Sequence, residues 1–206
     1  MWGIRMEVAL SNDLLKEKVL HKYDYNEKRI IGIMLARYDI NLTKKVISDS
    51  YQYWHLNTGK VIDIFWAGYG AYLSPEEQTS TKMILNFPGN SERVYFDLEA
   101  FISIKNEFNQ LCEKNYKDNM ELILANYYDG HIHFNEAFRI DLENNLDENY
   151  STIRQLVELI TNECRSKNNV ASLIKGLKKT EFFEVIKGFK PSDLINFALA
   201  AAGIVI

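Results

Sequence analysis

Short apolar runs alternate with amphipathic stretches through residues 29–166, and this order restricts the fold more than any other feature of the sequence. RIIGIMLARYDI (29–40) and KVIDIFWAGYG (60–70) are rich in β-branched residues and almost continuously apolar, which predicts strands buried on both faces. The stretch between them, 41–59, is predicted to be a helix because its apolar residues recur at helical spacing at Val46, Ile47, Tyr51 and Trp54. Strand, helix and strand in this order indicate a parallel crossover.

The second half of the region adds a helix, a hairpin and a further helix. An amphipathic stripe predicts a helix from about Asp97, and MELILANYY (120–128) predicts a strand. Asp129-Gly130 is a strong hairpin signal, so HIHFNEAFRIDL (131–142) is expected to return antiparallel. Residues 145–166 begin with capping residues and continue as a helix. Near the N-terminus, Ser11 or Asn12 is expected to cap another short helix.

The order of these elements resembles that of thioredoxin-like domains, a three-layer α/β core in which a βαβ unit precedes a ββα unit. That family carries a CxxC motif at the start of the first core helix and a cis-proline before the hairpin. The corresponding segments here, ARYDINLTKK (36–45) and NYKDNMEL (115–122), contain neither Cys nor Pro, so the resemblance implies no redox activity and no cofactor. A flavodoxin-like or other three-layer α/β fold is the alternative.

Three parts are expected along the chain. An N-terminal helix and linker (1–28) precede the α/β core domain (29–166), and a helical, apolar C-terminal extension (167–206) follows.

The composition describes an ordinary globular protein of a reducing compartment. Among the 206 residues, a net charge of -4 argues against nucleic acid as a partner. The two cysteines, Cys112 and Cys164, form no CxxC pair, which fits a cytoplasmic protein. We expect no signal peptide and no membrane-spanning helix, because no early apolar run and no stretch of about 18 apolar residues is present. Abundant Asn, Lys and Ile hint at a bacterial source.

The stretch WHLNTGKVIDIFWAGYG (54–70) provides the catalytic candidates His55, Asp63 and Tyr69. An aspartate inside an apolar strand needs a partner if it is buried. Lys60, Arg37 or a helix N-terminus could supply that partner. If His55 folded back over the strand, the pair would form an oriented base. The favoured interpretation is structural: a histidine at a helix end, followed by core aromatics.

Two binding sites are also conceivable from the sequence. Arg37 and Asp39, with the backbone of Gly68, follow two parallel strands and are candidates for holding an anion, although an ion pair that only shapes the loop is favoured. His131 and His133 alternate onto one strand face, but two ligands at so general a spacing predict no metal site. Phosphate-loop, dinucleotide-binding and nucleophile-elbow motifs are absent, which favours a non-catalytic role.

The C-terminal stretch from Leu194 to Ile206 contains one polar residue, Asn196. As a helix it would be about 20 Å long, short of the ~30 Å core of a bilayer. Packing on its own domain or on a partner protomer is favoured. The residues predicted to form an interface are Leu194, Ile195, Phe197 and Leu199.

Three functions are consistent with these patterns. The leading hypothesis is a non-redox protein-interaction module, an accessory or assembly protein that binds a protein partner or a second copy through its C-terminal segment. The second is a hydrolase or small-ligand-binding enzyme with a strand-end pocket of Arg37, His55, Asp63 and Tyr69. The third is a membrane-associated effector of a bacterial defence or toxin system that acts through the C-terminal tail; membrane association is not favoured.

Overall fold

The computed structural model describes residues 7–58, 61–86, 93–111, 116, 118–142 and 150–177. The first half contains β1 (Glu7–Ala9), α1 (Asn12–Lys22), β2 (Arg29–Leu35), α2 (Asn41–Thr58) and β3 (Ile64–Ala67). Two short strands and a 3-10 turn follow: β4 (Tyr69–Gly70), η1 (Pro75–Glu77) and β5 (Lys82–Ile84). The second half contains β6 (Tyr95–Asp97), α3 (Leu98–Leu111), β7 (Glu121–Tyr128), β8 (His131–Asp141), α4 (Tyr150–Cys164) and α5 (Val170–Leu177).

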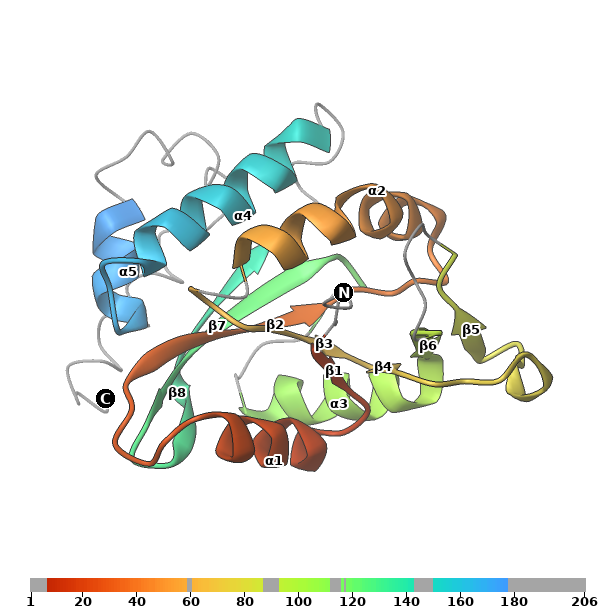
Figure 1. Ribbon diagram of the computed structural model, residues 1–206, viewed down its shortest axis with the longest axis horizontal. Coiled ribbons are helices and arrows are strands. Elements are labelled where there is room, and N and C mark those ends of the chain that lie inside the picture. The colour runs from red at the N-terminus through yellow and green to blue at the C-terminus, as the bar shows by residue number, and fades with distance from the viewer. Residues whose placement is uncertain are drawn as a thin grey trace.

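The larger sheet has five strands in the order β1-β3-β2-β7-β8. β3 pairs in parallel with both β1 and β2, whereas β7 is antiparallel to β2 and β8 is antiparallel to β7. Figure 1 shows α2 and α4 on one side of this sheet and α1 and α3 on the other. The predicted mixed α/β architecture, with a parallel βαβ crossover and an antiparallel hairpin, is therefore confirmed.

Burial on both sides explains the apolar strands. Ile31, Ile33 and Met34 of β2 are fully or almost fully buried, and so is Phe65 of β3. The helical stripe predicted between these strands, Val46, Ile47, Tyr51 and Trp54, is buried in α2. The sheet thus lies in the centre of one core that both helix layers cover.

The chain changes sheets at Gly68, where the sequence predicted one continuous strand. The φ angle of Gly68 is +80°, a conformation that side chains disfavour, and an added Cβ would lie 2.5 Å from Phe101 Cβ. The Gly68 N–H donates to Ala9 O, and Gly68 O accepts from the Asp97 N–H, each at 2.8 Å. These bonds end β3 and direct β4 into a second sheet with the order β4-β6-β5. The expected strand is therefore two strands, divided by a glycine.

Local turns and caps follow the sequence closely. Ser11 caps α1 and accepts a hydrogen bond from the Leu14 N–H at 3.1 Å. Asp129 and Gly130 have φ angles of 50° and 73°, the conformation that a two-residue hairpin requires. β2 ends at Leu35, earlier than predicted, because the chain turns where the Ile40 N–H donates to Arg37 O at 3.3 Å.

The beginning of the predicted C-terminal extension packs on the core. Val170, Leu173 and Ile174 of α5 are buried. The Val170 N–H donates to Oδ1 of buried Asn126 in β7 at 2.7 Å, which fixes the start of α5 on the sheet. Residues 178–206, including the apolar tail, lie outside the described residues.

Candidate functional site

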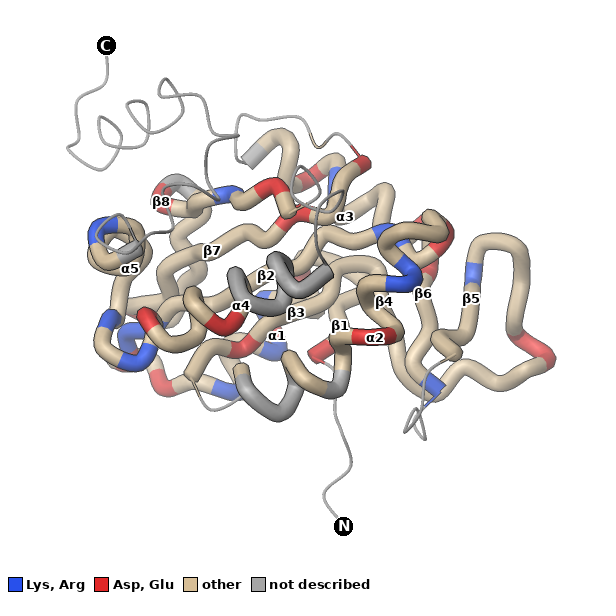
Figure 2. Tube along the Cα trace, turned by 90° about the horizontal axis from the view of Figure 1, so that it is seen from above, with Lys and Arg blue, Asp and Glu red and all other residues tan. Residues whose placement is uncertain are grey.

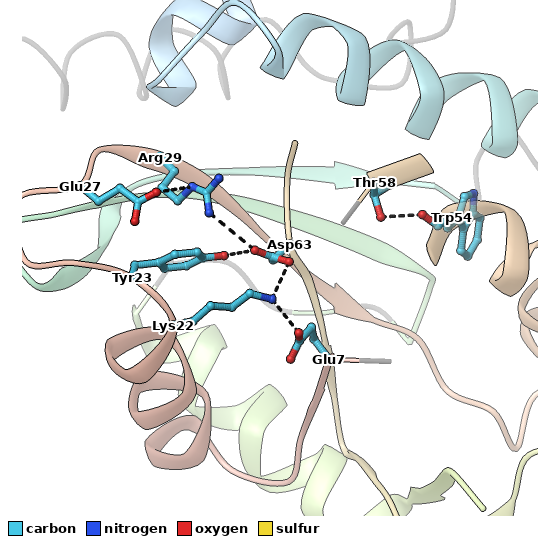
Figure 3. Close-up of polar contacts among 8 residues, drawn as sticks. All are labelled: Glu7, Lys22, Tyr23, Glu27, Arg29, Trp54, Thr58 and Asp63. Carbon is cyan, nitrogen blue, oxygen red and sulfur yellow. Dashed lines mark hydrogen bonds and ion pairs between the residues drawn. The ribbon is translucent and has the colours of Figure 1, made fainter. Parts of the chain in front are cut away.

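A buried carboxylate dominates the polar interior of the described chain. Asp63, which directly precedes β3, is only 7% exposed. One carboxylate oxygen accepts a short hydrogen bond from Tyr23 Oη, and the other accepts from Lys22 Nζ at 2.7 Å. Figure 3 shows both side chains reaching Asp63 from the end of α1. The carboxylate therefore joins α1 to the parallel strands.

A second ring of charges surrounds these three residues. Lys22 Nζ also donates to Glu7 Oε1 of β1 at 2.6 Å. The Arg29 guanidinium of β2 lies 3.9 Å from Asp63 Oδ2 and 3.2 Å from Glu27 Oε1. The same guanidinium lies over the Tyr23 ring, 4.6 Å from its centroid, a cation–π distance. We call Glu7, Lys22, Tyr23, Glu27, Arg29 and Asp63 the Asp63 cluster.

The protonation of the Asp63 cluster follows from burial and charge. Burial raises the pKa of Tyr23 well above its ordinary value, and the negative charge of Asp63 raises it further. Burial acts to lower the pKa of Lys22, but hydrogen bonds to Asp63 and Glu7 outweigh it, and the pKa is raised. At neutral pH Tyr23 is therefore a neutral donor and Lys22 a cation.

These contacts make Asp63 a link between elements rather than an accessible base. Both of its oxygens are engaged by donors of the protein. Its partners differ from the two basic residues considered from the sequence: Arg37 binds elsewhere, and Lys60 lies outside the described residues. The sequence signalled that Asp63 needs a partner, but nothing local pointed to Lys22, 41 residues away.

A hollow of about 510 Å³ lies beside the cluster, next to the edge strand β1. Glu7 and Lys22 belong to both features. Leu10, Leu14 and Tyr72 contribute apolar walls, and the polar residues Glu17, Lys18 and His21 line it as well. Leu14 is 41% exposed and Tyr72 is 69% exposed. Leu14 of α1 and Tyr72, which follows β4, thus present apolar surface to water at a concave surface, an arrangement typical of binding sites. We call this hollow the α1 groove.

Tyr72 stands out by its backbone as well as its exposure. Its φ angle is 71°, in the left-handed region that residues with a Cβ rarely occupy. Strained backbone of this kind is enriched at ligand sites. No feature of the sequence near Tyr72 indicated this conformation.

Arg37, Asp39 and Tyr69 follow the carboxyl ends of β2 and β3, and Tyr69 also lines the α1 groove, as Glu7 and Lys22 do. Arg37 Nη2 donates to Asp39 Oδ2 at 2.6 Å, and Arg37 Nη1 lies 3.3 Å from Asp118 Oδ1. Tyr69 is buried, and its Oη donates to Ala36 O at 2.8 Å. Burial raises the pKa of Tyr69 well above its ordinary value, helped by nearby Tyr116, Tyr38 and Asp39.

This geometry bears on two predictions from the sequence, the anion site at Arg37 and the catalytic pocket around Asp63. Arg37 forms the loop-shaping pair with Asp39. The Gly68 N–H, the group that could bind an anion, already donates to Ala9 O. Asp63 and Tyr69 flank opposite ends of β3 and are separated by six residues, roughly 20 Å of extended chain. His55 lies in α2, and its side chain is outside the described part. The structure therefore does not gather Arg37, Asp63 and Tyr69 into one pocket.

The remaining sequence candidates lie elsewhere. His131 is exposed, and the His133 ring stacks on Tyr128 with centroids 3.5 Å apart. Within the described ranges, no group of three or more His, Cys, Asp or Glu side chains is placed to hold a metal ion. The predicted interface residues all lie outside the described ranges: Leu194, Ile195, Phe197 and Leu199. Among the described helices, none has both the length and the apolar character needed to cross a membrane.

No protein-family model matches the chain, and no curated protein or solved structure matches it either.

Proposed function

We propose that the chain is a non-redox protein-interaction module with a thioredoxin-like core. The strand order β1-β3-β2-β7-β8, in which one βαβ crossover is followed by an antiparallel hairpin, supports this fold. The segment that joins β2 to α2, residues 36–40, contains no cysteine. Burial raises the pKa of the Cys164 thiol to about 12, so Cys164 is protonated at neutral pH and is a poor nucleophile.

The observation that carries this proposal is the α1 groove with its exposed Leu14 and Tyr72. Solvent-exposed apolar side chains that flank a hollow mark contact surfaces more often than scattered ones do. The ion pair of Lys22 with Asp63 and the hydrogen bond of Tyr23 to Asp63 hold α1 on the sheet, so the wall that carries Leu14 is fixed before a partner arrives. A rigid wall lowers the entropic cost of binding.

We propose the C-terminal segment of a second copy as the occupant of the α1 groove. The stretch from Leu194 to Ile206 has a single polar residue, so it matches the apolar part of the wall, which includes Leu10, Leu14 and Tyr72. Burial of Leu194, Ile195, Phe197 and Leu199 would contribute about 2 kcal/mol each before the cost of association. The four contributions sum to about 8 kcal/mol, and the cost of association reduces this sum, so we expect an affinity weaker than micromolar.

The test is the solution mass of four proteins, measured by light scattering over a range of concentrations. These are the full chain, a chain that ends at Phe189, and the full chains with Leu14→Glu and Leu20→Glu. Leu20 is also on α1 and is 54% exposed, but it does not line the groove, so it is the matched control. The full chain and Leu20→Glu should form the same oligomer, whereas truncation and Leu14→Glu should both give monomers.

Each other outcome separates the parts of the proposal. If truncation gives a monomer and Leu14→Glu does not, the tail binds a surface other than the α1 groove. A full chain that stays monomeric at all concentrations and copurifies with no protein would refute the interaction module itself.

A further inference from the structure

A second hollow, of about 320 Å³, lies at the end of α4 and differs in character from the α1 groove. Lys28 and Arg29 at the start of β2 line one part of it, and Arg165 and Lys167 line another. Ile30, Val61 and Cys164 complete the lining. Figure 2 shows Lys and Arg positions gathering at the end of the molecule where α4 runs into α5. We call this hollow the basic pocket.

The four cations of the basic pocket differ in their ion pairs. Arg29 lies 3.2 Å from Glu27 and 3.9 Å from Asp63. The other cations, Lys28, Arg165 and Lys167, form no ion pair with an acidic side chain within the part of the chain that the structure describes. Like charges around one hollow repel one another, and an anion between them would turn this repulsion into attraction.

Arg165 and Lys167 follow the C-terminus of α4, where cations can serve only to stabilise the helix. Cations at a helix C-terminus are often only partners of its partial negative charge. Here the carbonyls of Asn162, Glu163 and Cys164 accept from backbone N–H groups of the following turn at 3.2, 3.3 and 3.4 Å. Moreover, Lys28 and Arg29 come from the strand side, not from α4. Capping of α4 thus leaves the convergence of two elements unexplained.

We infer that the basic pocket binds a phosphate group. Guanidinium groups match phosphate oxygens in pairs of parallel hydrogen bonds, and lysines add point charges. A hollow of about 320 Å³ is at the small end of ligand sites, which suits a phosphate ester or a diphosphate. A free phosphorylated metabolite and a phosphorylated side chain of a partner protein would present the same phosphate group to this pocket. The basic pocket shares Arg29 with the Asp63 cluster, but it shares no lining residue with the α1 groove.

Binding is tested with inorganic pyrophosphate, titrated by calorimetry into the full chain at about 50 mM salt, where screening of surface charges is modest. Saturable binding with a dissociation constant below about 1 mM is expected. The combined substitutions Arg165→Gln and Lys167→Gln should weaken it by roughly tenfold or more, since each removes one of the converging charges. Both sites are outside the buried core, and an unchanged urea midpoint would verify folding.

The matched control carries Lys16→Gln and Lys45→Gln, which change the net charge equally on α1 and α2, away from the pocket. Its affinity should stay within about twofold of the parent. Equal losses in both double variants, or no saturation up to about 10 mM, would overturn the inference, because attraction would then be general or absent. A phosphoserine peptide tested in parallel identifies the source: tighter peptide binding indicates a protein-bound phosphate, and tighter pyrophosphate binding indicates a free ligand.

Discussion

Replacing Asp63 with asparagine tests whether the Asp63 cluster holds α1 on the sheet. The change preserves shape and removes the charge that Tyr23 and Lys22 contact. Removal of one partner from a buried pair costs about 3–5 kcal/mol. Here Lys22 and Arg29 are 34% and 30% exposed and keep Glu7 and Glu27 as partners, so water and these acids offset part of the loss. We expect Asp63→Asn to lower the free energy of unfolding by about 2 kcal/mol.

A double-mutant cycle with Tyr23→Phe separates the hydrogen bond from general damage. The phenol donates to a charged acceptor, so Tyr23→Phe alone should cost about 1.5 kcal/mol. In the Asp63→Asn background the acceptor is neutral, and the same change should cost less by about 1 kcal/mol. Urea unfolding followed by tryptophan fluorescence measures each variant; a loss of ~2 kcal/mol corresponds to a midpoint lower by about 0.7–1 M.

Asp13→Asn is the control for this cycle. Asp13 is also on α1, but its side chain is 95% exposed, and its oxygen lies 3.6 Å from Lys16. The control should change stability by less than about 0.5 kcal/mol. If Asp63→Asn shifts the urea midpoint no more than Asp13→Asn does, then Asp63 does not secure α1, and the preorganised wall of the α1 groove loses its support.

Three further predictions concern alkaline stability, a glycine and a thiol. Because the pKa of Tyr23 is raised above its ordinary 10.0, the folded chain holds the phenol proton more tightly than the unfolded chain, so the stability it contributes is complete below pH 10.0 and is lost as pH rises further. The free energy of unfolding should therefore fall above that pH, and less steeply in Tyr23→Phe; equal slopes would contradict the assigned contact. Gly68→Ala should cost about 3 kcal/mol or more, through its positive φ and the crowding by α3, whereas Gly176→Ala in α5 should stay within about 1 kcal/mol, since a flexible carboxylate is the nearest neighbour; urea midpoints distinguish the two. With Cys112 replaced by serine, Cys164 should react with a thiol reagent at pH 8 far more slowly in the native chain than in urea, because burial raises its pKa to about 12; comparable rates would contradict burial.

Local features of the sequence anticipated most elements. Alternation of apolar runs and helical stripes located β2, α2 and β7, because strand and helix periodicities are properties of neighbouring residues. Ser11 capped α1 as expected, and Asp129-Gly130 formed the predicted hairpin turn. In these places the local preference and the tertiary contacts agree, so one sequence was enough to find them.

The sequence was less informative about the candidate site. It indicated that Asp63 requires a partner, but its partners come from α1 and β2, 41 residues away in the case of Lys22. It grouped Asp63 with Arg37 and Tyr69, which the parallel sheet places at opposite ends of β3. Six residues of extended chain already separate Asp63 from Tyr69 by roughly 20 Å. The position of Arg37 relative to the two depends on how β2 pairs with β3, which no local pattern fixes.

Local sequence patterns are thus sufficient to locate several strands and helices and some of the points at which they begin and turn. The tertiary structure decided three things: that the strand breaks at Gly68, that α1 supplies the partners of Asp63, and that four cations converge at the end of α4. The physical reason is range. Caps, turns and periodicity act over a few residues, whereas buried charges and pockets depend on the order of strands in the sheet and on the helices that cover it.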